Sequence, residues 1–553
     1  MIHSEWRHTK TPVEARGGLV TARHPAAAAV GARVLHHGGN ALDASIAAML
    51  ATGVAQPFAT TIGGGGLLTA ATPDGRAYSM DYRSEAPSDA TPDMFSAAQV
   101  IPGLFGWALP GRVNEIGHLA IGVPGAVPGY QAAHGELGRL PWQDVMTPAI
   151  ELAGEGIETD WFGSLMQGVY LDQLLRYETT ARTFLRDGQY PHRPATSAPG
   201  DLFWQPLLAT TLREVADGGL DAYLAGSAAD ALSTEMATRG GLITRTDISS
   251  YQPRLTPPDK IAYRGYRILG PAHGGLYGLL FGVLQLLDIA GTDTLAPRRL
   301  HLVAEAIRRC RHVENVHAGD HQSPVWVEHP TVATEIAETI DPDRRTDDWR
   351  DAWWAQGQSS AEIRPEGTAH VSVIDADGMA VSLTETVLGA FGSAVTTPAG
   401  MLLNNAMFGF VPVPDHPNSI RPGHRPHSNM TPLVVLDQSD SPIIAAGASG
   451  GQRISAATVQ LVTYLLDQGL APQDAANTPR LDVHGDRVLL DANIPATVAS
   501  DLDRRGHHVQ RVHDDLTTFH FANPAALTVN EDGVIRSGLN PLHLTAACGL
   551  DDA

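Results

Sequence analysis

The residues of this chain that could carry out acyl transfer are a threonine at the edge of a predicted strand and a diglycine before a predicted helix. Thr368 begins an alternating segment, and Gly450-Gly451 precedes a helical pattern over residues 454–466. A threonine hydroxyl is a weak nucleophile that needs a base to remove its proton. Backbone N–H groups at a helix start can stabilise an oxyanion. An ordinary strand threonine and an ordinary loop glycine pair would have the same sequence, so the residues alone leave both interpretations open.

Thr368 is expected at the leading edge of a β-hairpin. Apolar and polar residues alternate over 370–374, a turn is predicted at Asp377-Gly378, and the alternation resumes over 380–384. The preceding segment, 319–365, is more polar, and part of it is predicted to be flexible. A flexible segment that ends at a threonine is typical of a self-cleaving precursor, and equally of any linker.

The sequence patterns in the rest of the chain predict helices and strands that could position such a site. Helices are expected at 25–37, 41–54, 142–153, 300–312 and 454–466, and mostly helical sequence is expected over 162–247. Asn40 is predicted to cap the second helix. Strands are expected at 16–22, 263–269, 433–436, 443–446, 488–490 and 526–529. The mixture is consistent with an α/β fold.

Two further features could belong to the site, a run of four glycines at 63–66 and an arginine, Arg83. The glycines at 63–66 lack the Gly-Lys-Ser/Thr continuation of a phosphate loop, so a close backbone approach inside a sheet is expected instead of nucleotide binding. Arg83 follows a predicted strand and could bind a carboxylate with two parallel hydrogen bonds. A surface ion pair is the alternative for this arginine.

Composition limits the classes of partner. The formal charge of −22 over 553 residues opposes binding to nucleic acid or to an anionic membrane surface. No apolar stretch is long enough to span a membrane, and no secretory signal is visible. The two cysteines, Cys310 and Cys548, predict neither a disulfide framework nor a zinc site. We therefore expect a cytoplasmic protein without a metal ion or cofactor.

Taken in order, the motifs of this chain resemble those of the gamma-glutamyltransferase (gamma-glutamyltranspeptidase) family of N-terminal-nucleophile (Ntn) hydrolases. Each motif is weak by itself, but their order is specific and the similarity runs nearly end to end. The matching segments are Gly38-Gly39-Asn40-Ala41-Leu42-Asp43-Ala44, residues 63–66, Asp81-Tyr82-Arg83-Ser84-Glu85-Ala86-Pro87, Gly122-Val123-Pro124-Gly125, Tyr263-Arg264-Gly265-Tyr266, Thr368-Ala369-His370, Leu402-Leu403-Asn404-Asn405, Arg425-Pro426-His427-Ser428 and Gly450-Gly451.

The resemblance implies a four-layer αββα sandwich, in which two stacked sheets lie between helices. It also implies a precursor that cuts itself between Gly367 and Thr368, giving a large subunit, 1–367, and a small subunit, 368–553. The two fragments would stay associated in one intertwined structural domain. The freed α-amino group of Thr368 has a near-neutral pKa and could act as the base, directly or through water.

The resemblance also implies roles for individual residues. The expected catalytic residues are Thr368 as nucleophile, Thr386 as its supporting hydroxyl, and Gly450 and Gly451 as the oxyanion hole. The expected substrate-binding residues are Arg83, Ser428 and Asn429.

Several positions depart from the family pattern. Ala369 replaces a second threonine, and Asn429 replaces the second serine of a pair. The family's asparagine, glutamine and acidic contacts are replaced by Leu388, Ala406 and Gly409. A site without an anionic partner for an ammonium group should reject a zwitterion, because the charge would be buried unpaired. Glutathione is therefore not the expected substrate.

We expect a hydrolase that cleaves an acyl bond of a small carboxylate-bearing substrate, and a place in specialised-metabolite (antibiotic) biosynthesis fits the altered pocket. Phe391, Phe408 and Phe410 could form apolar walls of this pocket, with burial in the core as the alternative. Three further functions stay open. They are a carbon–carbon bond hydrolase of 4-alkylproline-type pathways, a genuine gamma-glutamyl transferase, and a non-catalytic binding relative.

Overall fold

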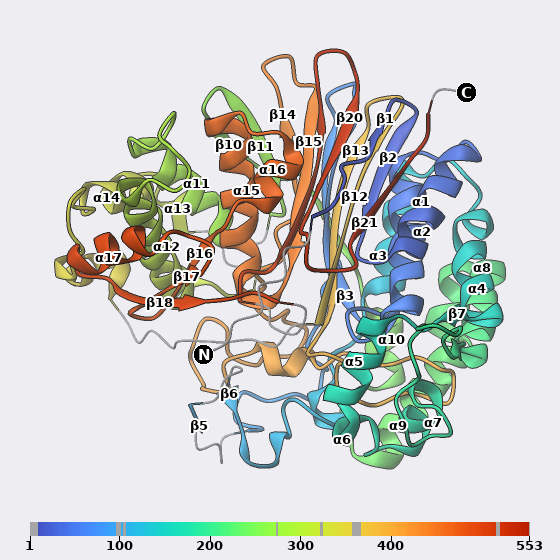
Figure 1. The fold of residues 1–553 in the computed structure, drawn as a ribbon. Coiled ribbons are helices and arrows are strands. Elements are labelled where there is room, and N and C mark those ends of the chain that lie inside the picture. Colours follow the sequence, from blue (N-terminus) through green and yellow to red (C-terminus); the bar gives the residue numbers. More distant parts are fainter. Residues whose placement is uncertain are drawn as a thin grey trace.

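Two stacked sheets form the centre of the molecule, and helices cover both outer faces (Figure 1). The computed structural model describes residues 9–95, 101–102, 107–272, 275–320, 325–356, 367–515 and 520–551. Each of the two central sheets has seven strands, and all of their pairings are antiparallel. This arrangement confirms the predicted four-layer αββα sandwich.

The first sheet contains the predicted hairpin of Thr368. Its strand order is β21 (Ala546–Gly549), β2 (Gly18–Ala22), β12 (Gly367–Asp375), β13 (Ala380–Leu388), β3 (Gly65–Ala71), β4 (Ala77–Asp81) and β9 (Arg254–Thr256). The β12–β13 hairpin occupies the middle of the sheet, so both of its edges are paired and its residues are almost all buried.

The second sheet packs against the first through β15, which contacts both β12 and β13. Its order is β1 (Glu14–Ala15), β20 (Ile535–Leu539), β19 (Asn523–Val529), β15 (Pro442–Ser449), β14 (Leu433–Leu436), β11 (Tyr266–Gly270) and β10 (Asp259–Tyr263). The prediction of one strand over 263–269 is wrong. Arg264 and Gly265 both have positive φ (51° and 87°) and turn the chain into a tight hairpin.

The helices form the two outer layers. On the first sheet lie α1 (Pro25–His36), α2 (Ala41–Ala55), α3 (Ala126–Leu137), α4 (Trp142–Glu155), and beyond them α5 (Trp161–Val169), α6 (Leu171–Leu174), α7 (Glu178–Phe184), α8 (Pro206–Ala225), α9 (Ser227–Arg239) and α10 (Arg245–Ser250). On the second sheet lie α11 (Leu276–Leu286), α15 (Ile454–Gln468) and α16 (Pro472–Asn477), and beyond them α12 (Pro297–His317), α13 (Val325–Glu328), α14 (Val332–Glu338) and α17 (Ala496–Arg504).

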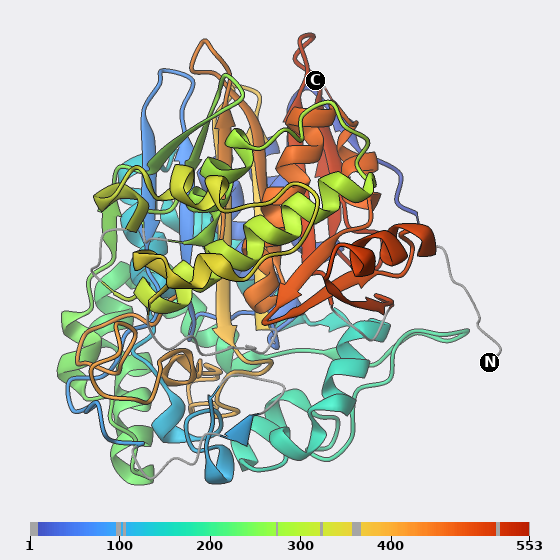
Figure 2. The same cartoon turned by 90° about the vertical axis from the view of Figure 1, so that its left-hand side faces the viewer.

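A small third sheet lies beside α12, which crosses the outer face of the second sheet in Figure 2. Its strands are β16 (Leu481–His484), β17 (Arg487–Asp491) and β18 (His508–Val512). Two strand pairs lie outside the sheets, β5 (Ile101–Pro102) with β6 (Trp107–Ala108) and β7 (Ile157–Glu158) with β8 (Leu202–Phe203). In the segment 319–365, Trp349 and Trp354 are buried. Residues 321–324 and 357–365 of this segment lie outside the described residues.

Helix α2 shows how the sequence builds the layer behind the hairpin. Asn40 caps it by accepting hydrogen bonds from the backbone N–H groups of Leu42 and Asp43, and the Asp43 carboxylate accepts from the N–H of Asn40. This capping box confirms the predicted N-cap. Every residue of α2 is buried, and its many alanines let it pack closely between the first sheet and α4.

The glycines at 63–66 lie where two backbones meet. A Cβ atom on Gly63 would lie 2.2 Å from the carbonyl oxygen of Leu402, and one on Gly64 would lie 2.5 Å from that of Thr386. Side chains are excluded here by sterics, which confirms the predicted close approach inside a sheet. The approach places β3 tightly beside the end of β13 that carries Thr386.

The segment before Thr368 and the segment after it each supply strands to the two central sheets. The segment before it supplies β1, β10 and β11 to one sheet and β2, β3, β4 and β9 to the other. The segment after it supplies the remaining strands. A cut at this point would leave two interleaved fragments that share both central sheets.

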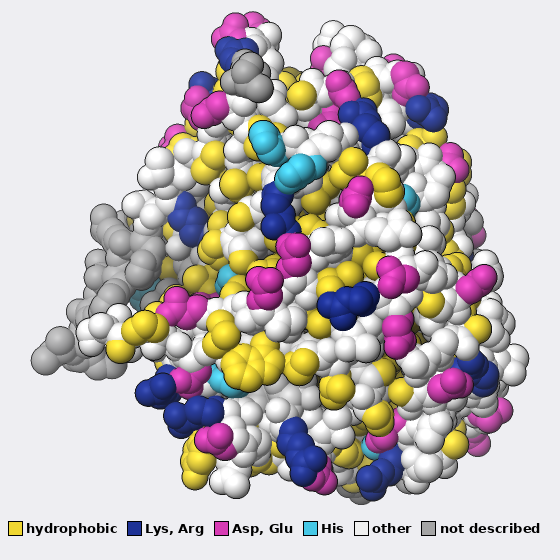
Figure 3. All heavy atoms as spheres, turned by 90° about the vertical axis from the view of Figure 1, so that its right-hand side faces the viewer, with side chains coloured by type: hydrophobic (Ala, Val, Ile, Leu, Met, Phe, Trp, Pro, Cys, Tyr) yellow, Lys and Arg dark blue, Asp and Glu magenta, His cyan; other side chains and the backbone are white. Residues whose placement is uncertain are grey.

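The surface gives no sign of a polyanion-binding face on the side drawn in Figure 3, where acidic and basic side chains are interspersed. None of the helices among the described residues is both long and apolar enough to cross a membrane. No group of three or more His, Cys, Asp or Glu side chains in this part of the chain is arranged to hold a metal ion.

Glu385 is a carboxyl group buried in the layer between β13 and the helices. It accepts hydrogen bonds from the hydroxyls of Thr60 and Tyr130, and burial raises its pKa to about 7. The folded protein therefore holds a proton between about pH 4.5 and 7 that the unfolded chain releases. This group stabilises the fold below that window, and its contribution is lost as the pH rises through it.

We predict that Glu385→Gln flattens the dependence of stability on pH. The amide is neutral at every pH, so the loss of up to about 3 kcal/mol between pH 5 and 8 should be absent. Urea denaturation at both pH values measures this difference. Glu136→Gln, on the exposed side of α3, is the control and should keep the wild-type slope. Parallel slopes for wild type and Glu385→Gln would contradict the prediction.

Candidate active site

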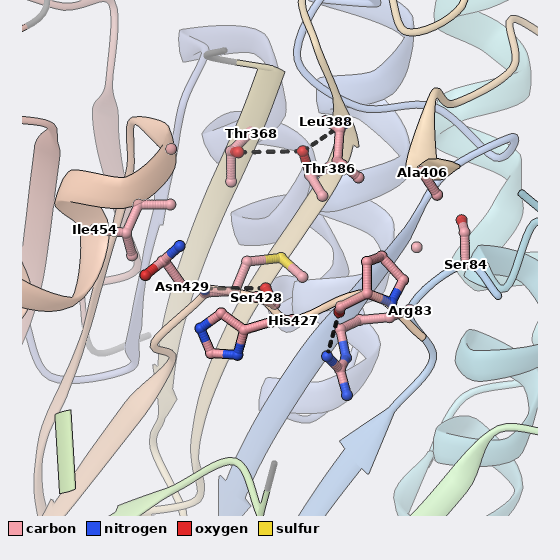
Figure 4. A pocket seen from close by; sticks show the side chains of 14 residues that line it. Arg83, Ser84, Thr368, Thr386, Leu388, Ala406, His427, Ser428, Asn429 and Ile454 are labelled. Atoms are coloured by element: carbon pink, nitrogen blue, oxygen red, sulfur yellow. Dashed lines mark hydrogen bonds between the residues drawn. The ribbon is translucent and has the colours of Figure 1, made fainter. Parts of the chain in front are cut away.

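Thr368 and Thr386 face each other across the β12–β13 hairpin (Figure 4). The Thr368 hydroxyl donates to Oγ1 of Thr386 at 3.1 Å, and the N–H of Leu388 donates to the same oxygen at 2.8 Å. The Thr386 hydroxyl in turn donates to the carbonyl oxygen of Gly367. One hydroxyl thus links the side chain of Thr368 to the peptide bond that precedes it.

A β-bulge produces this geometry. Gly367 pairs with Leu388 and Thr368 pairs with Thr386, so Val387 is the extra residue on β13. Leu388 has φ of 70°, in the left-handed region that a leucine rarely adopts. Such a conformation costs on the order of 1–3 kcal/mol and persists only where the surroundings impose it. The bulge turns the N–H of Leu388 toward Thr386, as bulges beside active sites often do.

Arg23 is a third residue that touches Thr368, and no motif in the sequence points to it. It follows β2, the strand that pairs with β12 on the side opposite to β13. Its guanidinium donates to the carbonyl oxygen of Thr368 and lies 5.6 Å from the centre of the Phe58 ring. A buried cation therefore contacts the backbone of Thr368.

The diglycine lies at the turn between β15 and α15. Gly450 and Gly451 have φ of 133° and 63°, and a Cβ atom on Gly450 would lie 2.7 Å from Cα of Ala522. Gly451 starts the 3₁₀ turn Gly451–Arg453 that leads into α15. The first N–H groups of a helix have no acceptor within the helix. The turn thus supplies the kind of donor that an oxyanion hole needs.

One cavity of about 50 Å³ brings together most of the residues that the sequence singled out. Six of the seven line it, namely Arg83, Thr368, Thr386, Ser428, Asn429 and Gly451, and Gly450 immediately precedes the last of them. The remaining lining residues are Gly65, Ser84, Leu388, Ala406, Pro426, His427, Met430 and Ile454. No carboxylate side chain is among the described residues that line this cavity.

Arg83 is held in the cavity wall by a buried ion pair. Its Nε and Nη2 donate to the two oxygens of Asp81 at 3.0 and 2.8 Å, and Nη1 donates to the carbonyl oxygen of Pro426 at 2.8 Å. Although burial alone would raise the pKa of Asp81, Arg83 and Arg425 hold that pKa well below its ordinary value. A guanidinium has five N–H groups. Nη2 also lies 3.9 Å from Asp320, so the second N–H of Nη1 is the donor that remains for a ligand.

Ser84 is a cavity residue that the sequence motifs did not single out. Its hydroxyl oxygen is buried and has no hydrogen-bond partner among the described residues. An unsatisfied buried hydroxyl costs free energy, which a ligand could recover. The close-up shows the Ser84 hydroxyl on the same side of the cavity as Ala406 (Figure 4).

The positions that depart from the family pattern form an apolar part of the site. Leu388 and Ala406 line the cavity, and a Cβ atom on Gly409 would lie 2.8 Å from Cβ of Pro426. A longer side chain at 409 would therefore displace the proline. The three phenylalanines considered as walls do not line this cavity. They are buried in hydrophobic packing, and Phe391 for example packs against the rings of Phe58 and Phe184.

Comparison with known proteins identifies the family. The model of the gamma-glutamyltranspeptidase family matches residues 27–538. The acylase ACY 1 proenzyme of Pseudomonas sp. (strain V22) is 34% identical over 510 residues, covering 91% of this chain and 89% of that protein. The glutathione hydrolase proenzyme of Escherichia coli (strain K12) is 30% identical over 500 residues, covering 85% of this chain and 81% of that protein.

Solved structures agree with the fold. A cephalosporin acylase from Bacillus halodurans superimposes with a TM-score of 0.86 at 24% identity, covering 100% of this chain and 99% of the other. The gamma-glutamyltranspeptidase of Helicobacter pylori gives 0.55 at 28% identity, covering 66% of this chain and 100% of the other. The chain belongs to the gamma-glutamyltranspeptidase family, and it is an enzyme with the Ntn hydrolase fold.

Proposed function

We propose that this enzyme is a self-processing hydrolase in which Thr368 is the nucleophile and the substrate is an amide of a carboxylate-bearing acyl group without an ammonium group. The observation that supports it most is the hydrogen-bonded series from Thr368 through Thr386 to the carbonyl of Gly367, in a cavity whose described lining has no carboxylate side chain. The subunits would be 1–367 and 368–553, which both contribute strands to the two central sheets.

That series supports self-processing. The Thr368 oxygen attacks the carbonyl carbon of Gly367 as its proton leaves, and the Thr386 hydroxyl, already bonded to that carbonyl oxygen, stabilises the charge that develops. The C–N bond breaks, the nitrogen gains a proton, and an ester joins Gly367 to the Thr368 side chain. Water then hydrolyses the ester and releases a Gly367 carboxylate and a free Thr368 amine. The word proenzyme in the names of both relatives supports such a step.

Turnover would use the freed amine. The amine takes the proton of the Thr368 hydroxyl, directly or through water, while the oxygen attacks the substrate carbonyl. Gly450 and Gly451 would stabilise the oxyanion through their N–H groups. The leaving amine then receives the proton, and water hydrolyses the acyl ester to regenerate Thr368.

The lining of the cavity supports the proposed acyl group. Arg83 has an N–H group on Nη1 for a ligand, and the hydroxyls of Ser84 and Ser428 border the same space. Together with Asn429, these groups would bind the distal carboxylate of the acyl chain. An ammonium group would find no carboxylate partner among the described lining residues, since Asp81 already binds Arg83. An unpaired buried charge is strongly disfavoured.

Three finer points remain proposals from the sequence resemblance. Hydrolysis of an activated carbon–carbon bond would pass through the same acyl-enzyme, with a carbon instead of a nitrogen as the leaving atom. A place in antibiotic biosynthesis and a cytoplasmic location are expectations of the same kind. A genuine gamma-glutamyl transferase would differ from the proposed enzyme in its substrate preference, and a non-catalytic relative would differ in staying uncut.

We predict that the purified protein consists of two fragments that join at Gly367 and Thr368. Intact-mass measurement would give the masses of residues 1–367 and 368–553, and Thr368→Ala should give one uncut chain because it has no hydroxyl. Thr386→Val should slow the cleavage by about 100-fold, since it removes the group bonded to the Gly367 carbonyl.

Thr386→Ser is the matched control, because it keeps the hydroxyl, and it should cleave at close to the wild-type rate. A wild-type chain that stays intact, like Thr368→Ala, would contradict self-processing and favour the non-catalytic relative. Cleavage of Thr386→Val as fast as that of Thr386→Ser would show that the Thr386 hydroxyl does not act on this carbonyl.

We predict that the enzyme prefers glutaryl-4-nitroanilide to γ-L-glutamyl-4-nitroanilide. The two substrates differ only in the α-ammonium group, whose burial without a partner should lower kcat/KM by about 100-fold or more. Release of nitroaniline measures both rates. Preference for the γ-glutamyl compound would favour a genuine gamma-glutamyl transferase.

We predict that Arg23 lowers the pKa of the freed Thr368 amine. A neighbouring cation disfavours an ammonium group, so Arg23→Met should move the acidic limb of the kcat/KM profile upward by about one pH unit. Arg23→Lys keeps the charge and should keep the wild-type limb. Both variants are compared after complete processing, checked by mass. Equal rate losses in both without a shift would mean that Arg23 acts only by packing.

A further inference from the structure

The turn that carries the proposed oxyanion hole is held by an arginine from another part of the fold. The guanidinium of Arg311, on α12, donates a hydrogen bond of 3.2 Å to the carbonyl oxygen of Gln452. Gln452 directly follows Gly451 and belongs to the same 3₁₀ turn. Arg311 is not among the described residues that line the cavity of Thr368. Its effect on a reaction there would pass through the backbone of this turn.

Arg311 joins this turn to strand β16 of the small third sheet. Its Nη2 lies 2.8 Å from Oδ1 of Asp482, and its Nη1 donates to the carbonyl oxygen of Val483. Both residues belong to β16, which packs against α12. The N–H groups of a guanidinium have fixed directions in one plane. The three contacts together therefore determine where the Gln452 carbonyl lies relative to β16.

The Asp482 carboxylate holds Arg311 in this orientation. Asp482 is buried, and although burial alone would raise its pKa, Arg311 and His484 lower that pKa to about 2. The carboxylate is therefore ionised at neutral pH. One of its oxygens lies beside Arg311, and the other lies 2.8 Å from the ring of His484. Contacts between ionised groups are stronger than those between neutral groups, so the guanidinium is firmly placed.

The direction of the contact suits an oxyanion hole. Gly450 and Gly451 both have positive φ and wide conformational freedom, so neighbouring groups must fix the direction of their N–H groups. In a helical turn, the carbonyl groups and the N–H groups point toward opposite ends. A donor that binds the Gln452 carbonyl can therefore hold the turn without competing for the N–H groups that an oxyanion needs.

We propose that Arg311 is a positioning residue for the oxyanion hole, which it fixes through the carbonyl group of Gln452. This inference rests on the proposed function, because it needs an oxyanion at Gly450-Gly451. Self-processing would not need Arg311, since the carbonyl of Gly367 accepts a hydrogen bond from Thr386 instead. Loss of Arg311 should therefore slow turnover while cleavage of the precursor and binding of the substrate stay intact.

Variants of Arg311 test the proposal with glutaryl-4-nitroanilide. We expect Arg311→Met to lower kcat about tenfold or more, with KM within about twofold and precursor cleavage at the wild-type rate. Arg311→Lys keeps the charge and loses the planar fork, and it should lower kcat about threefold with less loss of packing. Arg350→Met removes the same charge from an exposed arginine that pairs with Asp486, and it should keep the wild-type kcat. Wild-type kcat in both Arg311 variants, or a change confined to KM, would overturn the assignment.

Hydrogen exchange separates this inference from the proposed function. In the Thr368→Ala chain, which cannot turn over, Arg311→Met should speed amide exchange over residues 451–455 about tenfold, and Arg350→Met should not. Faster exchange in Arg311→Met, with no turnover by the wild-type enzyme, would contradict the function and keep the role of Arg311 in fixing the turn. Turnover by the wild type, with exchange and kcat both unchanged in Arg311→Met, would keep the function and overturn the inference.

Discussion

The site depends on the hydrogen bonds of the Thr386 hydroxyl group. A hydroxyl has one proton to donate and two lone pairs to accept with. Thr368 and the N–H of Leu388 occupy the acceptor positions, so the single proton of Thr386 is directed to the carbonyl of Gly367. All of its hydrogen-bonding capacity is used, and its orientation is therefore fixed. The same hydroxyl can polarise the bond before Thr368 and hold the Thr368 oxygen in place.

Contacts on both faces of β13 hold the Thr386 hydroxyl in position. Successive side chains of a strand point to opposite faces, so Thr386 faces the second sheet while Glu385 faces the helical layer. Glu385 binds Thr60 and Tyr130 there, which ties β13 to the loop after α2 and to α3. On the lateral side, Gly64 lets β3 approach the carbonyl of Thr386 closely. The strain at Leu388 is thus supported by contacts on several sides.

The sequence predicts those elements that are determined by residues close together in the chain. The Thr368 hairpin follows from alternation and a Gly turn, and the capping of α2 follows from Asn40 and Asp43 three residues later. The sequence does not reveal the β10–β11 hairpin, because its turn needs a positive φ at Arg264, a conformation that residues other than glycine rarely adopt. Arg23 and Ser84 could not be found in this way, because their role depends on which strands become neighbours. The roles expected for Thr386 and for Gly450-Gly451 came from family resemblance, since a threonine or a glycine pair has no chemistry-specific spacing.

The layout of the site explains how a substrate preference can change while the cutting machinery stays the same. Thr368 and Thr386 lie on the two central strands of a sheet, where a shift would disturb packing on every side. The residues that would recognise the acyl group lie after β4, in the turn Ala406–Gly409 and in the segment before β14. Leu388 ends β13, whereas Ala406 and Gly409 lie in that turn. In the proposed enzyme, Leu388, Ala406 and Gly409 in place of polar groups would change which charge the cavity accepts, while Thr368 and Thr386 keep their places in the sheet.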